Sequence, residues 1–417
     1  MSKSFWIETL GCPKNQVDSE KIAGTLLLDG LNPADSPNDA NLIVINTCSF
    51  IEEAREESIE TVFELSQLRD DGAELVVTGC LAERYGDEIA SSLKSDVDAV
   101  VGFGVPVSIT SKPETPKFDL LNLPRPKREE PWGYVKVAEG CDRICGFCAI
   151  PSFRGPQRSR SIDDIREEAL SLDVQEIVLV AQDLASWGRD RRDSNEGVVD
   201  LVKEISELVP WVRLLYLYPS SLTGELLDII ASSPVPYFDL SLQHVSAPLL
   251  RKMRRWGDGE RFSKIISRIR KLQPEAAFRT NFIVGYPGET EDDHDRLIRF
   301  LEENMIDWCG FFPYSKEEGT YAATLNEEVP ETLILERVRE LGELQDEITQ
   351  KNRDSLIGSD VRVLVESSGV ARSHREAPDI DGLIIVSDNL KVGSFETVTI
   401  QEAFGTDLKA EVSPVKL

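Results

Sequence analysis

Two hydrophobic periods alternate along the first 112 residues. Short apolar runs have the length of strands, and after each run apolar residues recur every three or four positions, as in a helix. The expected strands are Phe5–Thr9, Leu42–Asn46 and Glu74–Thr78, and the expected helices lie near Asp18–Asp29, Ile51–Leu68 and Tyr85–Leu93. Strands that alternate with helices predict a parallel sheet. Asp18 and Ser19 are the side chains expected to cap the first helix.

The same alternation continues through six further units between Gly133 and about Pro313. The expected strands are Tyr134–Ala138, Glu176–Ala181, Val212–Leu217, Tyr237–Leu242, Ala277–Val284 and Trp308–Pro313. Six β/α units predict a partial (β/α)6 barrel. In barrels of this kind the chemistry lies at the carboxyl ends of the strands.

The rest of the chain changes character twice. Residues 330–353 have the period of one long amphipathic helix. From Gly358 onward, evenly spaced runs predict a small β-barrel, with strands at Val361–Val365, Gly382–Val386, Glu396–Ile400 and Leu408–Val412. The fold class is therefore α/β, with domains at 1–112, 132–351 and 352–417. The segment 113–131 is expected to be a stiff linker because it holds Pro113, Pro116, Pro124, Pro126 and Pro131.

Composition narrows the setting. The chain has 417 residues, of which 41% are hydrophobic and 29% charged, as in globular proteins in water. No apolar run approaches the ~20 residues that span a bilayer, and the N-terminus lacks the apolar core of a signal peptide. We therefore expect a cytoplasmic protein, with no membrane partner, whose seven cysteines stay reduced. The net charge of −28 favours a basic partner, although solubility alone would also explain it.

Three cysteines lie within eight residues, at Cys141, Cys145 and Cys148. Thiolates at this spacing reach one metal centre, and iron–sulfur clusters usually have four such ligands. Three ligands leave one coordination position open, as in a catalytic zinc site. A disulfide with a spare thiol, or a structural zinc site, is the alternative.

Three more cysteines each follow one expected strand of the N-terminal sheet. Cys12, Cys48 and Cys80 would therefore meet at the carboxyl edge of that sheet, where ligands of open α/β sheets bind. Buried cysteines are common, so the pattern alone leaves a second metal site and a set of packed thiols equally open.

The cysteine motif resembles the radical S-adenosylmethionine (SAM) enzymes, with Phe147 just before the last cysteine. Its flanks, GYVKVAEGCDRICGFCAIPSFRGPQRSR, resemble the methylthiotransferase branch, and so do TLGCPKNQVDSE, VINTCSFIEEAREES and VTGCLAERYGDE. The resemblance implies two [4Fe-4S] clusters and SAM. Cys141, Cys145 and Cys148 would hold the cluster that cleaves SAM to a 5′-deoxyadenosyl radical. Cys12, Cys48 and Cys80 would hold a second cluster that carries the sulfur to be inserted.

Further candidates for SAM binding lie at the ends of the barrel strands. The resemblance assigns such a contact to the region of Gln182 and Asp183. The other candidates at strand ends are Gln243, Gly285, Pro287, Gly288 and Glu289. Arg279 lies inside an expected strand, where it would point into the barrel or pair with a carboxylate, and it is a candidate for binding SAM or the substrate. Taken singly they are weak, because Gly-Tyr-Pro-Gly is an ordinary turn by composition. His244 and Cys309 are expected to be packing residues.

The C-terminal segment resembles a TRAM domain, and ARSHREAPDIDG resembles the version in the branch that modifies ribosomal protein uS12. The resemblance implies a methylthio group added to the β-carbon of an aspartate, with an electron donor such as flavodoxin or ferredoxin. The alternative is the branch that modifies N6-isopentenyladenosine of tRNA. The acidic segment, with only two aromatic residues beyond residue 353, disfavours tRNA. A non-catalytic iron–sulfur electron carrier is the third hypothesis.

Overall fold

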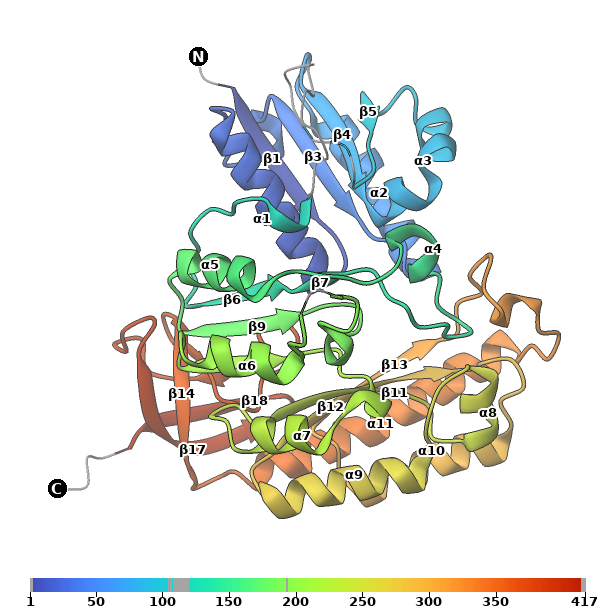
Figure 1. Cartoon of the computed structure of the whole chain (residues 1–417), viewed down its shortest axis with the longest axis vertical. Helices are drawn as coiled ribbons and strands as arrows, with labels where there is room; N and C mark the ends of the chain where they lie inside the picture. The colour runs from blue at the N-terminus through green and yellow to red at the C-terminus, as the bar shows by residue number, and fades with distance from the viewer. Residues whose placement is uncertain (1–2, 104, 106, 108–119, 193, 414–417) are drawn as a thin grey trace.

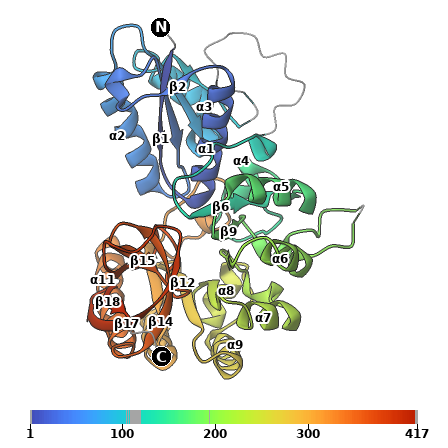
Figure 2. The same ribbon diagram turned by 90° about the vertical axis from the view of Figure 1, so that its left-hand side faces the viewer.

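The computed structural model describes residues 3–103, 105, 107, 120–192 and 194–413. The N-terminal sheet lies above an open half-barrel, and the C-terminal barrel lies beside that half-barrel (Figure 1, Figure 2). Among the described residues, no helix combines the length and the apolar character that crossing a bilayer requires.

The N-terminal sheet is parallel, with the order β2-β1-β3-β4-β5. Its strands are β1 (Ser4–Thr9), β2 (Asn32–Pro33), β3 (Leu42–Thr47), β4 (Glu74–Gly79) and β5 (Ala99–Val100). Its helices are α1 (Pro13–Leu28), α2 (Glu52–Leu68) and α3 (Cys80–Ser92), with a short 3-10 turn, η1 (Pro37–Asp39). All six residues of β3 are buried, because helices cover both faces of the sheet. The predicted parallel α/β sheet is confirmed.

The predicted cap of the first helix is wrong. Helix α1 begins at Pro13, five residues before Asp18, and Cys12 occupies the N-cap position. Proline is favoured at the first helical position because its missing N–H would have no partner there and its φ is already helical. Asp18 and Ser19 are therefore buried inside the helix instead of capping it.

Six parallel strands form the central half-barrel. They are β6 (Trp132–Lys136), β9 (Glu176–Val180), β10 (Trp211–Leu214), β11 (Tyr237–Gln243), β12 (Ala277–Val284) and β13 (Trp308–Pro313). They make two three-stranded sheets, β10-β9-β6 and β11-β12-β13. A parallel bridge between Leu217 and Leu240 joins the two sheets, so the strands follow one another in chain order. The predicted partial (β/α)6 barrel is confirmed.

Further helices belong to the half-barrel. They are α5 (Ile162–Leu172), α6 (Val198–Ser206), α7 (Gly224–Ala231), α8 (Ala247–Lys252), α9 (Gly259–Leu272) and α10 (Glu291–Asn304). The short helix α4 (Ile150–Arg154) instead packs against α3 of the N-terminal sheet. The short elements are β7 (Ala138–Glu139), β8 (Arg158–Ser159), η2 (Leu120–Asn122), η3 (Leu184–Ser186), η4 (Pro219–Ser221) and η5 (Ala322–Thr324). Helix α9 shows the pattern, since Phe262, Ile266 and Ile269 on one face are buried in the core.

The long helix α11 (Glu331–Asp354) leads into a closed barrel with the order β14-β15-β16-β18-β17. Its strands are β14 (Asp360–Ser367), β15 (Val370–Arg372), β16 (Ile384–Ile385), β17 (Phe395–Phe404) and β18 (Asp407–Val412). The predicted barrel is confirmed, although β15 was not foreseen. Arg372 pairs with Glu176 at the start of β9, 2.6 Å away. The barrel therefore lies against the amino ends of the half-barrel strands.

The predicted linker is described only in part. Pro113 and Pro116 lie outside the described residues, whereas residues 123–131 form neither helix nor strand. Arg125 fixes this segment, because it donates to Glu20 of α1 at 2.9 Å and to Glu168 of α5 at 2.8 Å. The exact domain boundaries stay a prediction.

Candidate active site

The loop after β7 brings Cys141, Cys145 and Cys148 together at the carboxyl face of the half-barrel. Backbone bonds hold its course, with Cys141 N donating to Gly155 O at 3.1 Å and Gly146 N to Met253 O at 2.8 Å. Burial, and then the nearby charges of Cys145 and Cys141, raise the pKa of Cys148 to about 12. The thiols are thus close enough to repel one another when ionised. A cationic iron centre removes that repulsion and deprotonates its ligands, so the group fits this site.

Two arginines enclose Tyr218 beside this first triad. Arg143 and Arg255 lie over its ring, at 3.9 Å and 4.0 Å from the centroid. Arg255 also donates to Cys145 Sγ at 3.4 Å, and Arg143 donates to Asp183 Oδ2 at 2.6 Å. Hydrogen bonds to ligand sulfur are one way in which a protein sets the potential of a cluster. Sequence reasoning missed both arginines.

The second triad lies at the carboxyl edge of the N-terminal sheet. Cys12 precedes α1, Cys48 follows β3, and Cys80 begins α3. Gly11, at φ +92°, lets the first loop pass directly against the second, because a Cβ at this position would lie 2.8 Å from Cys48 Cβ and 2.9 Å from its Sγ.

Charges within the second triad also interact. Burial, then the charges of Cys12 and Cys80, raise the pKa of Cys48 to about 12. Burial opposes ionisation of Cys12 as well, but Lys14, Arg154 and two backbone N–H groups outweigh it and lower the pKa of that thiol. The charges of the three thiols therefore interact, and the lowered pKa of Cys12 makes its thiolate easier to form, as a ligand of a cluster requires, so a cluster fits here too.

The separation of these side chains bears on the zinc alternative. Within the described part of the chain, no three His, Cys, Asp or Glu side chains converge closely enough to hold a single metal ion. Which metal group the six cysteines hold therefore stays a prediction at this point.

Arg154 joins the second triad to the half-barrel. It lies at the end of α4 and is buried. Its Nη2 lies 2.9 Å from Cys80 Sγ and 2.9 Å from Asn15 Oδ1, and its Nη1 lies 2.8 Å from Glu139 Oε1. Glu139 accepts in turn from Gln182 Nε2 at 2.7 Å. A continuous polar network therefore runs from the second triad to the residues predicted to bind SAM.

One short segment after β10 contacts residues next to both triads. Lys14, two residues after Cys12, has its Nζ 3.4 Å from the centroid of the Tyr216 ring. Two residues later, Arg255 lies over the ring of Tyr218, 4.0 Å from its centroid, and donates to Cys145 Sγ at 3.4 Å. The segment Tyr216–Tyr218 therefore has a neighbour of the second triad at one end and a neighbour of the first triad at the other.

Two of the remaining predicted SAM residues lie at different levels of the half-barrel. Gln243 ends β11, at its carboxyl end, with φ +73°. Arg279 lies near the amino end of β12, where it pairs with Asp239 at 3.3 Å and with Asp381 of the C-terminal barrel at 3.5 Å.

The turn after β12 holds itself together. Gly285 N donates to Glu289 Oε2 at 2.6 Å, and the same carboxylate pairs with Arg337 of α11 at 2.9 Å. Gly285 and Gly288 both have positive φ, and Pro287 lies between them. Glu289 thus has a structural role, and its SAM contact, like the others, stays a prediction.

His244 is a packing residue, as its solitary position indicated. It is fully buried, its Nδ1 accepts from Ser246 N at 3.0 Å, and burial lowers its pKa to about 4.

This histidine predicts an acid-sensitive step in stability. Its pKa is about 4 in the folded chain, whereas an ordinary histidine has a pKa of 6.5, so between these pH values the unfolded chain binds more protons. The free energy of unfolding is fully retained above pH 6.5 and should fall by about 3 kcal/mol as pH drops to 4. Urea unfolding of the wild type and of His244→Gln across this range measures it. Parallel pH profiles of the two proteins would contradict the assignment.

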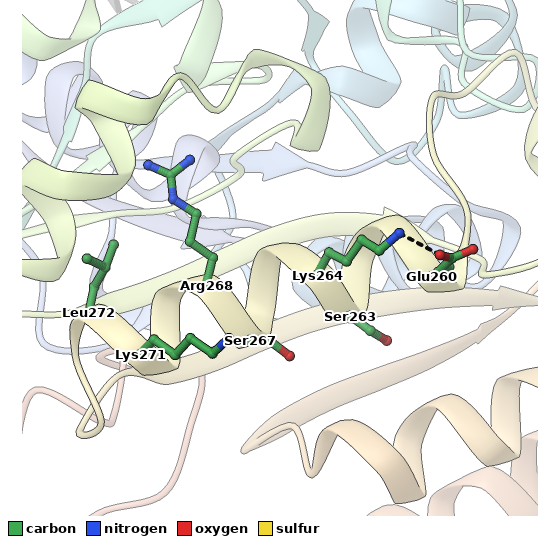
Figure 3. A pocket seen from close by; sticks show the side chains of 7 residues that line it. All are labelled: Glu260, Ser263, Lys264, Ser267, Arg268, Lys271 and Leu272. Carbon is green, nitrogen blue, oxygen red and sulfur yellow. Dashed lines mark hydrogen bonds and ion pairs between the residues drawn. The ribbon is translucent and has the colours of Figure 1, made fainter.

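A hollow of about 460 Å³ lies elsewhere, on the outer face of α9 (Figure 3). All seven lining residues come from that helix and its end, among them Lys264, which pairs with Glu260. No cysteine lines the hollow, and it contributes nothing to the site.

The half-barrel with its cysteine loop defines a radical SAM enzyme, and the N-terminal sheet adds a second triad. Residues 135–301 match the Radical SAM superfamily, residues 4–102 the Uncharacterized protein family UPF0004, and residues 357–412 the TRAM domain. The protein called ribosomal protein uS12 methylthiotransferase RimO from Myxococcus xanthus is 40% identical, over 98% of this chain and 92% of its own. The proteins of that name from Moorella thermoacetica and Aquifex aeolicus are each 39% identical, over 95% and 96% of this chain and 96% and 95% of theirs. The chain belongs to the family of ribosomal protein uS12 methylthiotransferases, RimO.

Among solved structures, the radical SAM methyltransferase TsrM from Kitasatospora setae is similar, with a TM-score of 0.47 and 13% identity over 75% of this chain and 72% of that chain.

Proposed function

We propose that this protein adds a methylthio group to the β-carbon of an aspartate in ribosomal protein uS12. The observation that carries the proposal is that the segment Tyr216–Tyr218 contacts both Lys14, next to the second triad, and Arg255, which donates to Cys145 of the first triad. One substrate side chain inserted beside that segment would reach both centres. The family relationship supplies the identity of the substrate.

The six cysteines divide the work. Cys141, Cys145 and Cys148 are the proposed ligands of the cluster that receives SAM, and Cys12, Cys48 and Cys80 those of the second cluster. When bound, SAM and the two clusters supply the carbon-radical and sulfur chemistry, which no side chain provides for an unactivated C–H bond.

The surrounding residues position these groups. Arg143 keeps Asp183 oriented, and Glu139 keeps Gln182 oriented, both by short hydrogen bonds. We assign SAM binding to these two residues together with Gln243, Arg279 and the turn at residues 285–289. Residues fixed in this way hold the reacting atoms in line without reorganisation during the reaction.

The proposed partners follow from the substrate. A basic ribosomal protein suits a chain of net charge −28. We place the reaction in the cytoplasm, where ribosomes are, with a one-electron donor such as flavodoxin or ferredoxin.

The test is a direct comparison of substrates. The protein is reconstituted without oxygen and supplied with SAM, sulfide and a reductant, and it is offered either uS12 or tRNA that carries N6-isopentenyladenosine. Mass spectrometry is expected to find the methylthio mass on one aspartate of uS12 and none on the tRNA. Modified tRNA with unmodified uS12 would refute the proposal, and SAM that stays intact would point to a mere electron carrier.

A further inference from the structure

One buried cation differs from all the others. Nine lysine and arginine side chains are buried in the described part of the chain. Eight pair with an Asp or Glu, and these are Lys21, Lys136, Arg154, Arg160, Arg213, Arg337, Arg353 and Arg372. Lys14 is 9% exposed and has, among the described residues, neither a carboxylate partner nor a side-chain hydrogen bond. A buried charge without a partner is costly, so this ammonium is suited to an anion that arrives from outside.

The position of Lys14 indicates that the anion is part of the substrate. Its Nζ lies 3.4 Å from the centroid of the Tyr216 ring, and Lys14 lies in the first turn of α1, two residues after Cys12. Cys12 and Tyr216 are both partly exposed, so accessible surface adjoins the ammonium. Lys14 therefore lies on the side of Tyr216–Tyr218 that faces the second triad, where the substrate side chain has to enter.

The backbone of Tyr216 is unusual in the same place. Its φ is +64°, a conformation that non-glycine residues rarely adopt, and Asp239 holds it by accepting from Tyr216 N at 2.9 Å. Strain of this kind persists when the surroundings enforce it, often at functional sites. Here it keeps the ring beneath the ammonium. The ring restricts where Nζ can lie without neutralising its charge.

Neighbouring cations are already occupied. Arg154 is held by Glu139, and Arg279 is shared between Asp239 and Asp381. Lys14 is thus the cation near the second triad, among the described residues, that retains its full capacity for a carboxylate.

We propose that Lys14 binds the carboxylate of the substrate aspartate. The inference rests on the proposed function and assigns the specificity of that site for an acidic side chain. In aspartate the β-carbon is bonded directly to the carboxylate carbon. An ion pair with Nζ would therefore fix the reacting carbon within a few ångströms of Lys14, beside Cys12 and Tyr216. An uncharged asparagine or a nucleobase would leave the ammonium unpaired.

Binding measured without turnover tests this proposal. Holoenzyme prepared without oxygen is mixed, in the absence of reductant, with uS12 or with uS12 that has asparagine in place of the target aspartate. The wild type should bind the aspartate form about tenfold more tightly, as expected for a charge-assisted pair. Lys14→Met should reduce this ratio to about one, and Lys14→Arg should keep most of it. Iron content is measured for each variant, and Lys14→Gln is made in parallel as a polar replacement.

A matched control is Lys264→Met, the same change at an exposed lysine of α9 that lies in the hollow of Figure 3. Its ratio should equal that of the wild type. Equal affinity of the wild type for both forms of uS12 overturns the proposal without any variant, and so does a wild-type ratio in Lys14→Met or Lys14→Gln. If uS12 gains no methylthio group at all, the proposed function fails. If uS12 is modified but the ratio does not depend on Lys14, only this inference fails.

Discussion

Cys48→Ala is expected to cleave SAM and yet leave uS12 unmodified. Cys48 lies after β3 in the second triad, whereas the first triad is built entirely from the loop at residues 141–148. Removing one thiol leaves the second cluster with two protein ligands. The half-barrel, whose core is separate from that of the N-terminal sheet, keeps its own cysteines. The methylthio product should therefore fall below detection, while 5′-deoxyadenosine still forms.

The reciprocal variant should lose both products. Cys145 receives a hydrogen bond from Arg255 and lies beside Tyr218 in the first triad, so Cys145→Ala should abolish cleavage of SAM. Liquid chromatography measures 5′-deoxyadenosine, and mass spectrometry measures modified uS12. Cys309→Ala is the matched control, because Cys309 packs against the core in β13 and is expected to keep both products. Methylthio product from Cys48→Ala, or deoxyadenosine from Cys145→Ala, would show that the triads have been given the wrong roles.

Much of the fold could be predicted because the position of most strands follows from the local pattern of hydrophobic residues. Three strands of the half-barrel, β6, β9 and β10, are wholly buried apolar-rich runs such as Glu176–Val180, and all six strands could be placed to within a few residues. The strand β15 was missed because three residues are too few for a period to be visible. The start of α1 was missed because Asp18 looks like a cap, while the proline that actually starts the helix lies five residues earlier.

The candidate site also has residues that could be predicted from the sequence and residues that could not. The cysteines of the second triad could be brought together from sequence, because topology alone places the carboxyl ends of parallel strands at one edge. Lys14 and Arg154 carried no such signal. Their importance depends on which charges surround them after folding, and Arg154 meets Cys80 across 74 positions of the chain. A lysine two residues after a cysteine is unremarkable until the structure shows that no carboxylate of the described residues pairs with it.

Arg154→Met is expected to loosen the contact between the N-terminal sheet and the half-barrel. Burial opposes ionisation of Glu139, but Arg154 and Lys136 hold the pKa of that carboxyl well below its usual value. Without the guanidinium, Glu139 keeps Lys136 and Gln182 as partners, and Asn15 and Cys80 lose a donor. Removing one partner of a buried ion pair typically costs about 3–5 kcal/mol. We therefore expect the free energy of unfolding, measured with urea under anaerobic conditions, to fall by about 3 kcal/mol.

Two control variants distinguish the loss of the Arg154 contacts from the mere loss of one positive charge. Arg296→Met removes an exposed arginine that pairs with Asp292 on α10, and it should cost less than about 1 kcal/mol because solvent screens such pairs. Arg154→Lys keeps the charge but lacks the planar fork that reaches Cys80, Asn15 and Glu139 together, so it should recover only part of the stability.

In Arg154→Met, the loss of the hydrogen bond to Cys80 Sγ should also lower the reduction potential of the second cluster, because N–H donors to ligand sulfur stabilise the reduced, more negative state of a cluster. A redox titration of Arg154→Met followed by electron paramagnetic resonance measures that shift. Wild-type stability together with an unchanged potential would mean that Arg154 merely fills space between the domains.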